Sequence, residues 1–379
     1  MFRRGIPLFN MFGFKVRLDA SWFFLALLIT WTLATGFFPF TYPGLSYGGY
    51  LWMGLSVAVG LFFSIIVHEF AHSWVARRFG MPMGGITLFL FGGVAEMEHE
   101  ATSPKMEFWM ALAGPATSVL VMLLFGGVTL LGLRAGWPTP VTGVTSYLST
   151  LNGILAVFNM VPAFPLDGGR VLRSALWQWK KNLQWATRIT SNLGSWFGVF
   201  LIVMGILRML EGAFIGGLWS VLIGLFLRGA AGASYRQLIM QRELEGEPVR
   251  RFMQTEVITV PPSLPLPELI NSHFYRSYHK RYPVTQEGRL AGYVDLDQVR
   301  RTPQQEWAYL QVGDIATPAN PESTIEADAD AMSALKRLSR DGGAEPLMVV
   351  QNNQLVGLLS LQDLQRFLSM KMKLEGEPG

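Results

Sequence analysis

The chain has 379 residues, half of them hydrophobic and 15% charged, whereas a soluble globular protein carries about 25% charged residues. The formal net charge of +4 is modest, and no nucleic-acid partner is expected. No cysteine is present, which excludes disulfides, thiolate metal sites and a cysteine nucleophile. The composition changes near Gly232: apolar blocks come before it, and a charged sequence with short alternating strands follows Tyr235.

Apolar blocks long enough to cross a bilayer fill the first part of the chain, since a spanning helix needs about 20 mostly apolar residues. We predict six spans, at residues 21–38, 51–76, 107–133, 143–162, 189–208 and 213–232. The fourth is the weakest, because it contains Asn152 and Asn159 and ends at Pro162. The first block is longer than a signal-peptide core and lacks a small-residue exit, so no cleavable signal peptide is expected.

The positive charges predict the orientation of these spans. Arg77 and Arg78 follow the second span, and further Lys and Arg residues precede the first, separate the fourth from the fifth and follow the sixth. The intervening loops hold almost none; residues 39–50 have no Lys or Arg. The positive-inside rule then places both termini in the cytoplasm. Six buried helices of a large soluble protein would not need this alternation.

The second block contains the motif His68-Glu69-Phe70-Ala71-His72. Residues four apart share one face of a helix, so both imidazoles can reach one metal ion. Glu69 lies beside them and can take a proton from a water at the metal, as in zinc proteases. The alternative is a pair of histidines satisfied by hydrogen bonds in a helix bundle. Ionisable groups in a span are costly and functional by default, which favours the metal site.

A glycine-rich segment, residues 84–97, separates the second and third spans. It is too short for a further span, its Ile, Thr and Phe favour strands, and Gly92-Gly93 is expected to turn a hairpin. A substrate helix must unwind before its peptide bonds can be attacked, and the hairpin edge could hold it as an added strand. The alternative is a hairpin with a purely structural role, which closes the cytoplasmic opening of the membrane domain.

A catalytic zinc ion needs three protein ligands and an open position. Asp167 is the best candidate for the third ligand, in the segment NMVPAFPLDGGR at residues 159–170. Its prolines interrupt the helix, and its two glycines allow close approach of the backbone. The alternative for Asp167 is a helix N-cap at the membrane surface. His99 lies among glutamates and is expected to be a surface residue.

The motifs HEFAH and NMVPAFPLDGGR resemble those of the site-2 protease family of intramembrane metalloproteases, over roughly residues 10–230. The resemblance implies that His68, His72 and Asp167 hold one Zn²⁺ and that Glu69 is the base. It also implies that Asn159 lies near the reacting carbonyl, although Asn159 could instead bond the broken helix backbone. The family supports substrate binding at the hairpin of Gly92 and Gly93.

Two similar units follow, at residues 246–303 and 307–372, with matching Gly292 and Gly357. They resemble tandem CBS (cystathionine-β-synthase) modules, which often bind adenine nucleotides between the repeats. The nucleotide signature of that family is present as Ser360 and Asp363 in the second unit. In the first unit Asp295 and Gln298 stand at these places. We therefore expect at most one site for ATP or AMP, and the alternative is a purely structural pair or one that forms homo-oligomers.

The predicted fold is a polytopic α-helical membrane protein with six spans and a β-hairpin insertion, followed by a cytoplasmic α/β tandem CBS domain. Residues 1–232 form the protease domain and 233–245 the linker. The predicted function is zinc-dependent hydrolysis of transmembrane protein substrates in the cytoplasmic membrane, under control of the CBS pair. The alternatives are an inactive relative that binds membrane helices and a CBS-regulated transporter, which would leave HEFAH without a purpose.

Overall fold

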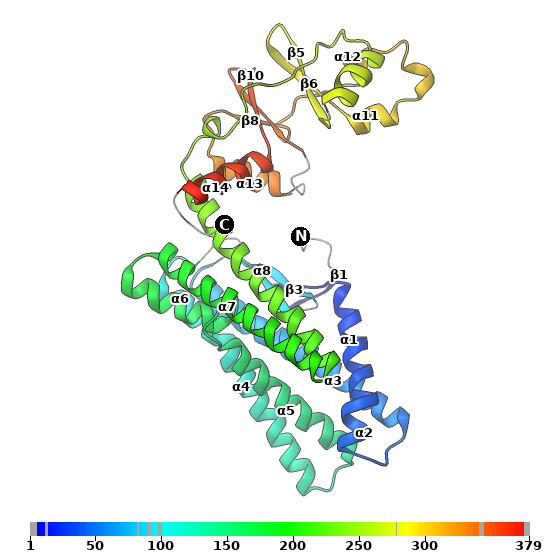
Figure 1. Cartoon of the computed structure of the whole chain (residues 1–379), viewed down its shortest axis with the longest axis vertical. Coiled ribbons are helices and arrows are strands. Elements are labelled where there is room, and N and C mark those ends of the chain that lie inside the picture. Colours follow the sequence, from blue (N-terminus) through cyan, green and yellow to red (C-terminus); the bar gives the residue numbers. More distant parts are fainter. Residues whose placement is uncertain are drawn as a thin grey trace. The chain divides into compact units, whose positions relative to one another are not determined.

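The computed structural model describes residues 6–11, 14–81, 83–89, 92–97, 101–277, 279–340 and 345–374. It contains two compact units, Met1–Arg236 and Gln237–Gly379. The helices and strands of the first unit are shown in Figure 1. They are β1 (Ile6–Met11), β2 (Phe14–Leu18), α1 (Ser21–Thr32), the π-helical turn η1 (Leu33–Phe37), α2 (Phe38–Thr41), α3 (Tyr47–Arg78), β3 (Met83–Phe89), β4 (Gly92–Met97), α4 (Pro104–Arg134), α5 (Thr139–Asn159), α6 (Asp167–Lys180), α7 (Leu183–Leu210) and α8 (Phe214–Leu244).

Six of the described helical segments are long and apolar enough to cross a membrane, which confirms the predicted number of spans. They comprise α1 to α2 taken together, then α3, α4, α5, α7 and α8. The fourth ends at Asn159 rather than Pro162, because Pro162 cannot continue a helix and disfavours one just before it. The predicted linker, 233–245, is helical as far as Leu244.

Local signals in the sequence explain where these helices begin and end. The Ser46 hydroxyl caps α3 by accepting a hydrogen bond from the Gly49 amide, and the Ser103 hydroxyl caps α4 in the same way. After α3 the chain turns at Gly80, whose φ of +82° is a conformation that favours glycine. The lengths of the spans therefore follow from hydrophobic composition, and their ends from capping residues.

A four-stranded sheet in the order β1-β2-β3-β4 accompanies the helices of the first unit. The β3–β4 hairpin confirms the predicted hairpin, but no pattern in the sequence indicated the β1–β2 hairpin or the parallel pairing between β2 and β3. The prediction that Gly92-Gly93 forms the turn is wrong: Gly92 pairs with Phe89 and Gly93 with Leu88, inside the ladder. The connection between these strands, residues 90–91, lies outside the described residues.

The second unit contains the sheet β5-β6-β10-β9-β8, with β7 paired to β6. Its strands are β5 (Arg281–Gln286), β6 (Arg289–Asp295), β7 (Thr317–Pro318), β8 (Thr324–Glu326), β9 (Leu347–Gln351) and β10 (Gln354–Leu359). Its helices are η2 (Val249–Arg251), α9 (Leu266–Glu268), η3 (Leu269–Phe274), α10 (Tyr275–Ser277), α11 (Leu296–Arg301), η4 (Gln304–Glu306), α12 (Val312–Ile315), α13 (Ala331–Arg340) and α14 (Leu361–Leu374).

The two repeats exchange their leading segments. Val249 and Phe252 come first in the chain, yet they pack in one core with residues of β9, β10, α13 and α14 from the second repeat. Val312 packs in the core of the first repeat. Backbone hydrogen bonds join Gln254 to Leu358 in both directions, at 2.8 and 3.0 Å. Neither core is complete within one contiguous repeat, so the repeats fold as a pair.

Candidate metal centre

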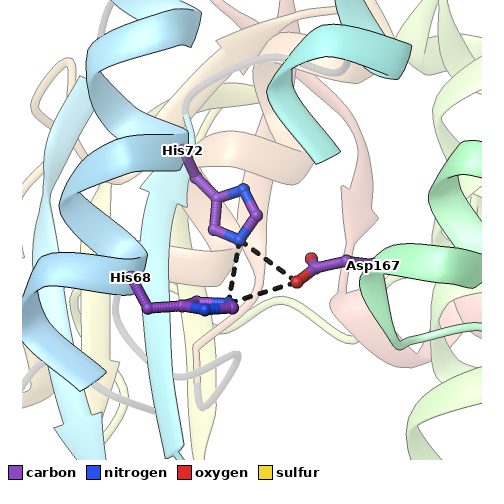
Figure 2. Close-up of side chains that lie close together, drawn as sticks. All are labelled: His68, His72 and Asp167. Atoms are coloured by element: carbon purple, nitrogen blue, oxygen red, sulfur yellow. Dashed lines mark hydrogen bonds and ion pairs between the residues drawn. The ribbon is translucent and has the colours of Figure 1, made fainter. Parts of the chain in front are cut away.

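His68 and His72 lie one turn apart on α3, and both side chains are buried. The spacing of four residues gives them the same face of the helix, as the sequence predicted. Their Nε2 atoms are 3.2 Å apart. Figure 2 shows that both imidazoles point toward Asp167, which belongs to a different helix.

Asp167 is the first residue of α6 and is also buried. The N-cap of α6 is Leu166, without a side-chain capping hydrogen bond, so capping does not explain the acidic residue at this place. The chain between α5 and α6 folds tightly: a Cβ atom on Gly168 would stand 2.6 Å from the carbonyl oxygen of Val161. The absence of a side chain at Gly168 therefore permits the backbone approach that brings Asp167 to α3.

The three side chains form a triangle that suits a zinc ion. Asp167 Oδ2 lies 3.2 Å from His68 Nε2 and 3.3 Å from His72 Nε2. Tetrahedral zinc with ligand bonds of about 2.0 Å has ligand atoms about 3.3 Å from one another. Among the described residues, His68, His72 and Asp167 are the group of His and acidic side chains that could hold a metal ion. Three ligands leave one position of the tetrahedron for water or substrate.

Hydrogen bonds on the far side of each imidazole leave Nε2 available to a metal. His68 Nδ1 lies 2.8 Å from Ser118 Oγ, and His72 Nδ1 lies 2.6 Å from the carbonyl oxygen of Met110. A carbonyl oxygen can only accept, so His72 donates from Nδ1, and in the neutral imidazole the lone pair then lies on Nε2, which faces the site. This arrangement of an imidazole between a metal and a protein acceptor is general in metal sites.

The ionisation state of Asp167 suits a metal cation. Burial would raise the pKa of the Asp167 carboxyl, but the imidazoles of His72 and His68 outweigh burial and hold this pKa below its ordinary value. The carboxylate is therefore ionised, which is the form that binds a metal.

The other predicted site residues lie on α3, at the end of α5 and in β4. Glu69 is half-buried on α3 beside both histidines, and Asn159 is half-buried at the last position of α5. Gly92 and Gly93 lie in β4, the last strand in the order of the first sheet. His99 lies outside the described residues.

In the second unit, Ser360 and Asp363 hydrogen-bond to each other and form a capping box at the start of α14. The Asp363 amide donates to Ser360 Oγ at 3.2 Å, and the Ser360 amide donates to the Asp363 carboxylate at 2.9 Å. The same carboxylate accepts from the side chain of Gln254. In the first repeat, Asp295 and Gln298 form the equivalent capping box for α11. The two positions of the signature therefore have a structural role in both repeats, whichever residues occupy them.

Sequence reasoning missed the contribution of α4 to this centre. Met110 and Ser118 contact the two imidazoles from α4, and Glu107 on the same helix pairs with Arg173 of α6. The spacing of Met110, Gly114 and Ser118 at every fourth residue is visible in the sequence. It carries no chemical signature by itself, because small and apolar residues are common in membrane helices.

Comparison with known proteins gives the family. The profile described as peptidase family M50 matches residues 56–134 and 137–205, and the CBS domain profile matches residues 249–303 and 312–370. Several relatives carry the name "Putative zinc metalloprotease". Rip3 of Mycobacterium tuberculosis is 33% identical, covering 99% of this chain and 96% of its own, and sll0528 of Synechocystis is 33% identical, covering 92% of each chain.

A solved structure, the site-2 protease from Methanocaldococcus jannaschii, matches with 26% identity and a TM-score of 0.43, over 60% of this chain and 94% of its own. The relatives from Mycobacterium and Synechocystis share a third of their residues with this chain over nearly its full length. The chain therefore belongs to the site-2 protease family, peptidase family M50, and carries a tandem CBS domain.

Proposed function

We propose that this chain is a zinc metalloendopeptidase of the site-2 type, which hydrolyses peptide bonds within or near transmembrane segments of other membrane proteins. The triangle of His68, His72 and Asp167 carries this proposal, because its edges of 3.2 to 3.3 Å match a face of a zinc tetrahedron. Membership of the metalloprotease family and six apolar helices agree with it.

The proposed chemistry assigns one role to each group. Zinc, when bound by the three side chains, supplies a Lewis acid for a water molecule and for the carbonyl of the peptide bond. The Glu69 carboxylate takes a proton from that water and later passes it to the leaving amine nitrogen. The Asn159 amide donates a hydrogen bond to the developing oxyanion. Helices α3, α4 and α6 surround the three ligand side chains and limit the access of other water molecules to them.

Asn159 is assigned this role because of its place in the fold. It ends α5, and the next residues fold back on the start of α6, where the backbone of Val161 lies against Gly168. Gly168 follows Asp167 directly in the chain. The last helical turn of α5, which carries Asn159, therefore lies close to Asp167 in the fold.

We assign substrate binding to the outer edge of β4. β4 is the last strand in the order of the described sheet, so its outer edge has no further strand among the described residues. An unwound substrate segment could extend the sheet there through main-chain hydrogen bonds. Gly92 and Gly93 have no side chains, so another backbone can come close to them.

The location follows from the charges. We place the chain in the cytoplasmic membrane with both termini in the cytoplasm, because Arg77, Arg78 and other basic residues lie at alternate ends of the spans. Residues 1–232 form the protease part, 233–245 connect it to the repeats, and 246–303 and 307–372 are the CBS repeats.

For the CBS pair we propose binding of one adenine nucleotide at the second repeat, with a change in protease activity. Ser360 and Asp363 support this, because the hydroxyl and the start of α14 suit a phosphate and the carboxylate suits a ribose. Asp363 already bonds to Gln254, so a ribose would share or displace that contact.

The decisive experiment compares wild-type cells with cells that carry Glu69→Gln. Loss of the base should leave membrane proteins uncut, so intact substrates should accumulate in the variant and membrane-helix fragments in the wild type, by membrane proteomics. Purified protein should cut an accumulated substrate, and the Glu69→Gln protein should not.

The same variant separates the alternatives. An inactive relative that only binds helices would give identical proteomes in both strains. A transporter would keep its flux after Glu69→Gln and would cut nothing. Either result would refute the proposed function.

A further inference from the structure

One face of α4 lines the metal centre. Met110, Gly114 and Ser118 are spaced four residues apart, so they lie along one side of the helix. All three are buried, although α4 is among the candidate membrane spans and much of its surface is exposed. We call these residues the α4 face.

Two residues of the α4 face contact the two histidines of the HEFAH motif. Ser118 contacts His68, and Met110, two turns earlier in α4, contacts His72, one turn later in α3. The two helices thus run in opposite directions past the site. Each imidazole receives its own hydrogen-bonding partner on the Nδ1 side, at 2.8 and 2.6 Å.

Gly114 lies between these two partners and leaves the space that the imidazoles fill. A Cβ atom at this position would stand 2.5 Å from Cε1 of His72 and 2.6 Å from Nε2 of His68. Real Cβ atoms do not approach side-chain atoms so closely. Any residue other than glycine would therefore displace at least one imidazole from the triangle with Asp167.

We propose that the α4 face positions the two imidazoles for the metal, with Ser118 as the residue that fixes the ring orientation and tautomer of His68. The inference rests on the proposed function and extends it from the ligands to the residues behind them. With Nδ1–H of His68 donated to Ser118 Oγ, Nε2 keeps its lone pair for the ion. Without the hydroxyl, the ring can rotate and the proton can occupy Nε2.

The expected effect is on metal affinity. Removing such an outer partner commonly costs about 10- to 100-fold in metal affinity or activity. If Ser118 served only to pack α3 against α4, its removal would lower stability and leave zinc binding unchanged. Zinc affinity and the geometry of the bound metal are therefore the readouts that separate positioning from packing.

A matched serine provides the control. Ser64 is also buried, and its hydroxyl also links two helices, since it accepts from the side chain of Asn152 at 3.0 Å. The Ser64 hydroxyl accepts from Asn152 and donates to the carbonyl oxygen of Gly60, whereas the Ser118 hydroxyl bonds to an imidazole. Ser64→Ala should therefore cost helix packing to a similar extent without changing the environment of the metal.

The experiment measures Zn²⁺ binding to full-length wild-type, Ser118→Ala and Ser64→Ala proteins in detergent, by competition with a chelating dye. Visible absorption of the Co²⁺ forms reports the ligand geometry. We expect Ser118→Ala to bind zinc roughly 10- to 100-fold more weakly, with an altered Co²⁺ spectrum. Ser64→Ala should match the wild type in both measurements.

A second pair of variants tests Gly114. Gly114→Ala should lose zinc, whereas Gly127→Ala on the same helix should not, because a Cβ atom at Gly127 meets nothing within 4 Å. Circular dichroism and size-exclusion chromatography establish that each variant is folded, and Ser118→Ala decides the matter if Gly114→Ala does not fold.

Equal zinc affinity and equal Co²⁺ spectra in the wild type and Ser118→Ala would overturn the inference and leave the proposed function standing. Failure of the wild type to bind zinc would instead contradict the proposed function. The two failures are therefore distinguishable in one set of measurements.

Discussion

At the residue scale, the acidic side chain of Asp167 joins two imidazoles from another helix. It lies 99 positions from His68 in the chain and 3.2 Å from it in space. A catalytic zinc site at these histidines would need Asp167 as its third ligand, since such sites use three protein ligands. Burial also requires a cation near Asp167, because a buried carboxylate needs a positive partner.

Removal of Asp167 should therefore remove the metal. We expect Asp167→Ala, His68→Ala and His72→Ala to contain little zinc after purification and to cut nothing, as measured by elemental analysis and a cleavage assay. Glu69→Gln is the matched control, since it alters an acidic residue beside the ligands and should lose activity while keeping one zinc ion per chain. Full zinc occupancy in Asp167→Ala would exclude this residue as a ligand.

At the element scale, a buried ion pair fixes α6, and with it Asp167, against α4. The Arg173 guanidinium bonds to the Glu107 carboxylate, which is fully buried, and lies 5.0 Å from the centre of the Phe164 ring. One partner without the other would be an uncompensated charge in an apolar interior.

Arg173→Met should therefore destabilise the folded protein by about 3–5 kcal/mol, as unfolding in detergent would show. The double variant Arg173→Met/Glu107→Leu should recover much of this loss, because it leaves no buried charge. Arg250→Met is the control: Arg250 pairs with Asp328 at the surface, both more than half exposed, and its loss should change little. A single variant as stable as the wild type would show that the pair does not hold α6.

The β3–β4 hairpin is the other element that we expect to matter for catalysis. Gly92→Val should block cleavage of a membrane-helix substrate while zinc content stays unchanged, because a branched side chain hinders the approach of a second backbone. Gly127→Val, at an open position on α4, is the comparison. Cleavage by Gly92→Val at the wild-type rate would contradict strand addition at β4.

At the scale of the whole molecule, the CBS repeats are joined to the protease unit through α8, which contains the boundary between the two units. The repeats fold as a pair, so a ligand in one changes the stability of both. Coupling between distant sites is typically worth about 1–3 kcal/mol, or roughly 5- to 150-fold in affinity.

The full-length protein should bind ATP or AMP in calorimetry, and Asp363→Ala should weaken the binding. Gln298→Ala is the matched control, because it breaks the equivalent capping box in the first repeat and should leave the affinity unchanged. No binding of either nucleotide at millimolar concentration would assign the pair a structural or dimerising role, and the metal centre would be unaffected.

The sequence by itself determined the features that depend on local periodicity and composition. Six spans follow from runs of apolar residues, and two imidazoles on one face follow from the spacing of His68 and His72. The prediction did not use the capping residues Ser46 and Ser103, and it placed the starts of these two spans at residues 51 and 107, a few residues inside the helices. These features need only neighbours within one or two helical turns, and so they can be recognised in a single sequence.

Only the tertiary structure decided the features that depend on contacts between distant segments. The α4 face reaches the imidazoles because α3 and α4 pack in opposite directions, and Ser118 looks like any other small residue in a membrane helix. The parallel pairing of β2 with β3 and the exchange of Val249 between repeats are likewise contacts over long separations. Their free energy comes from packing between elements, which no local pattern in the chain records.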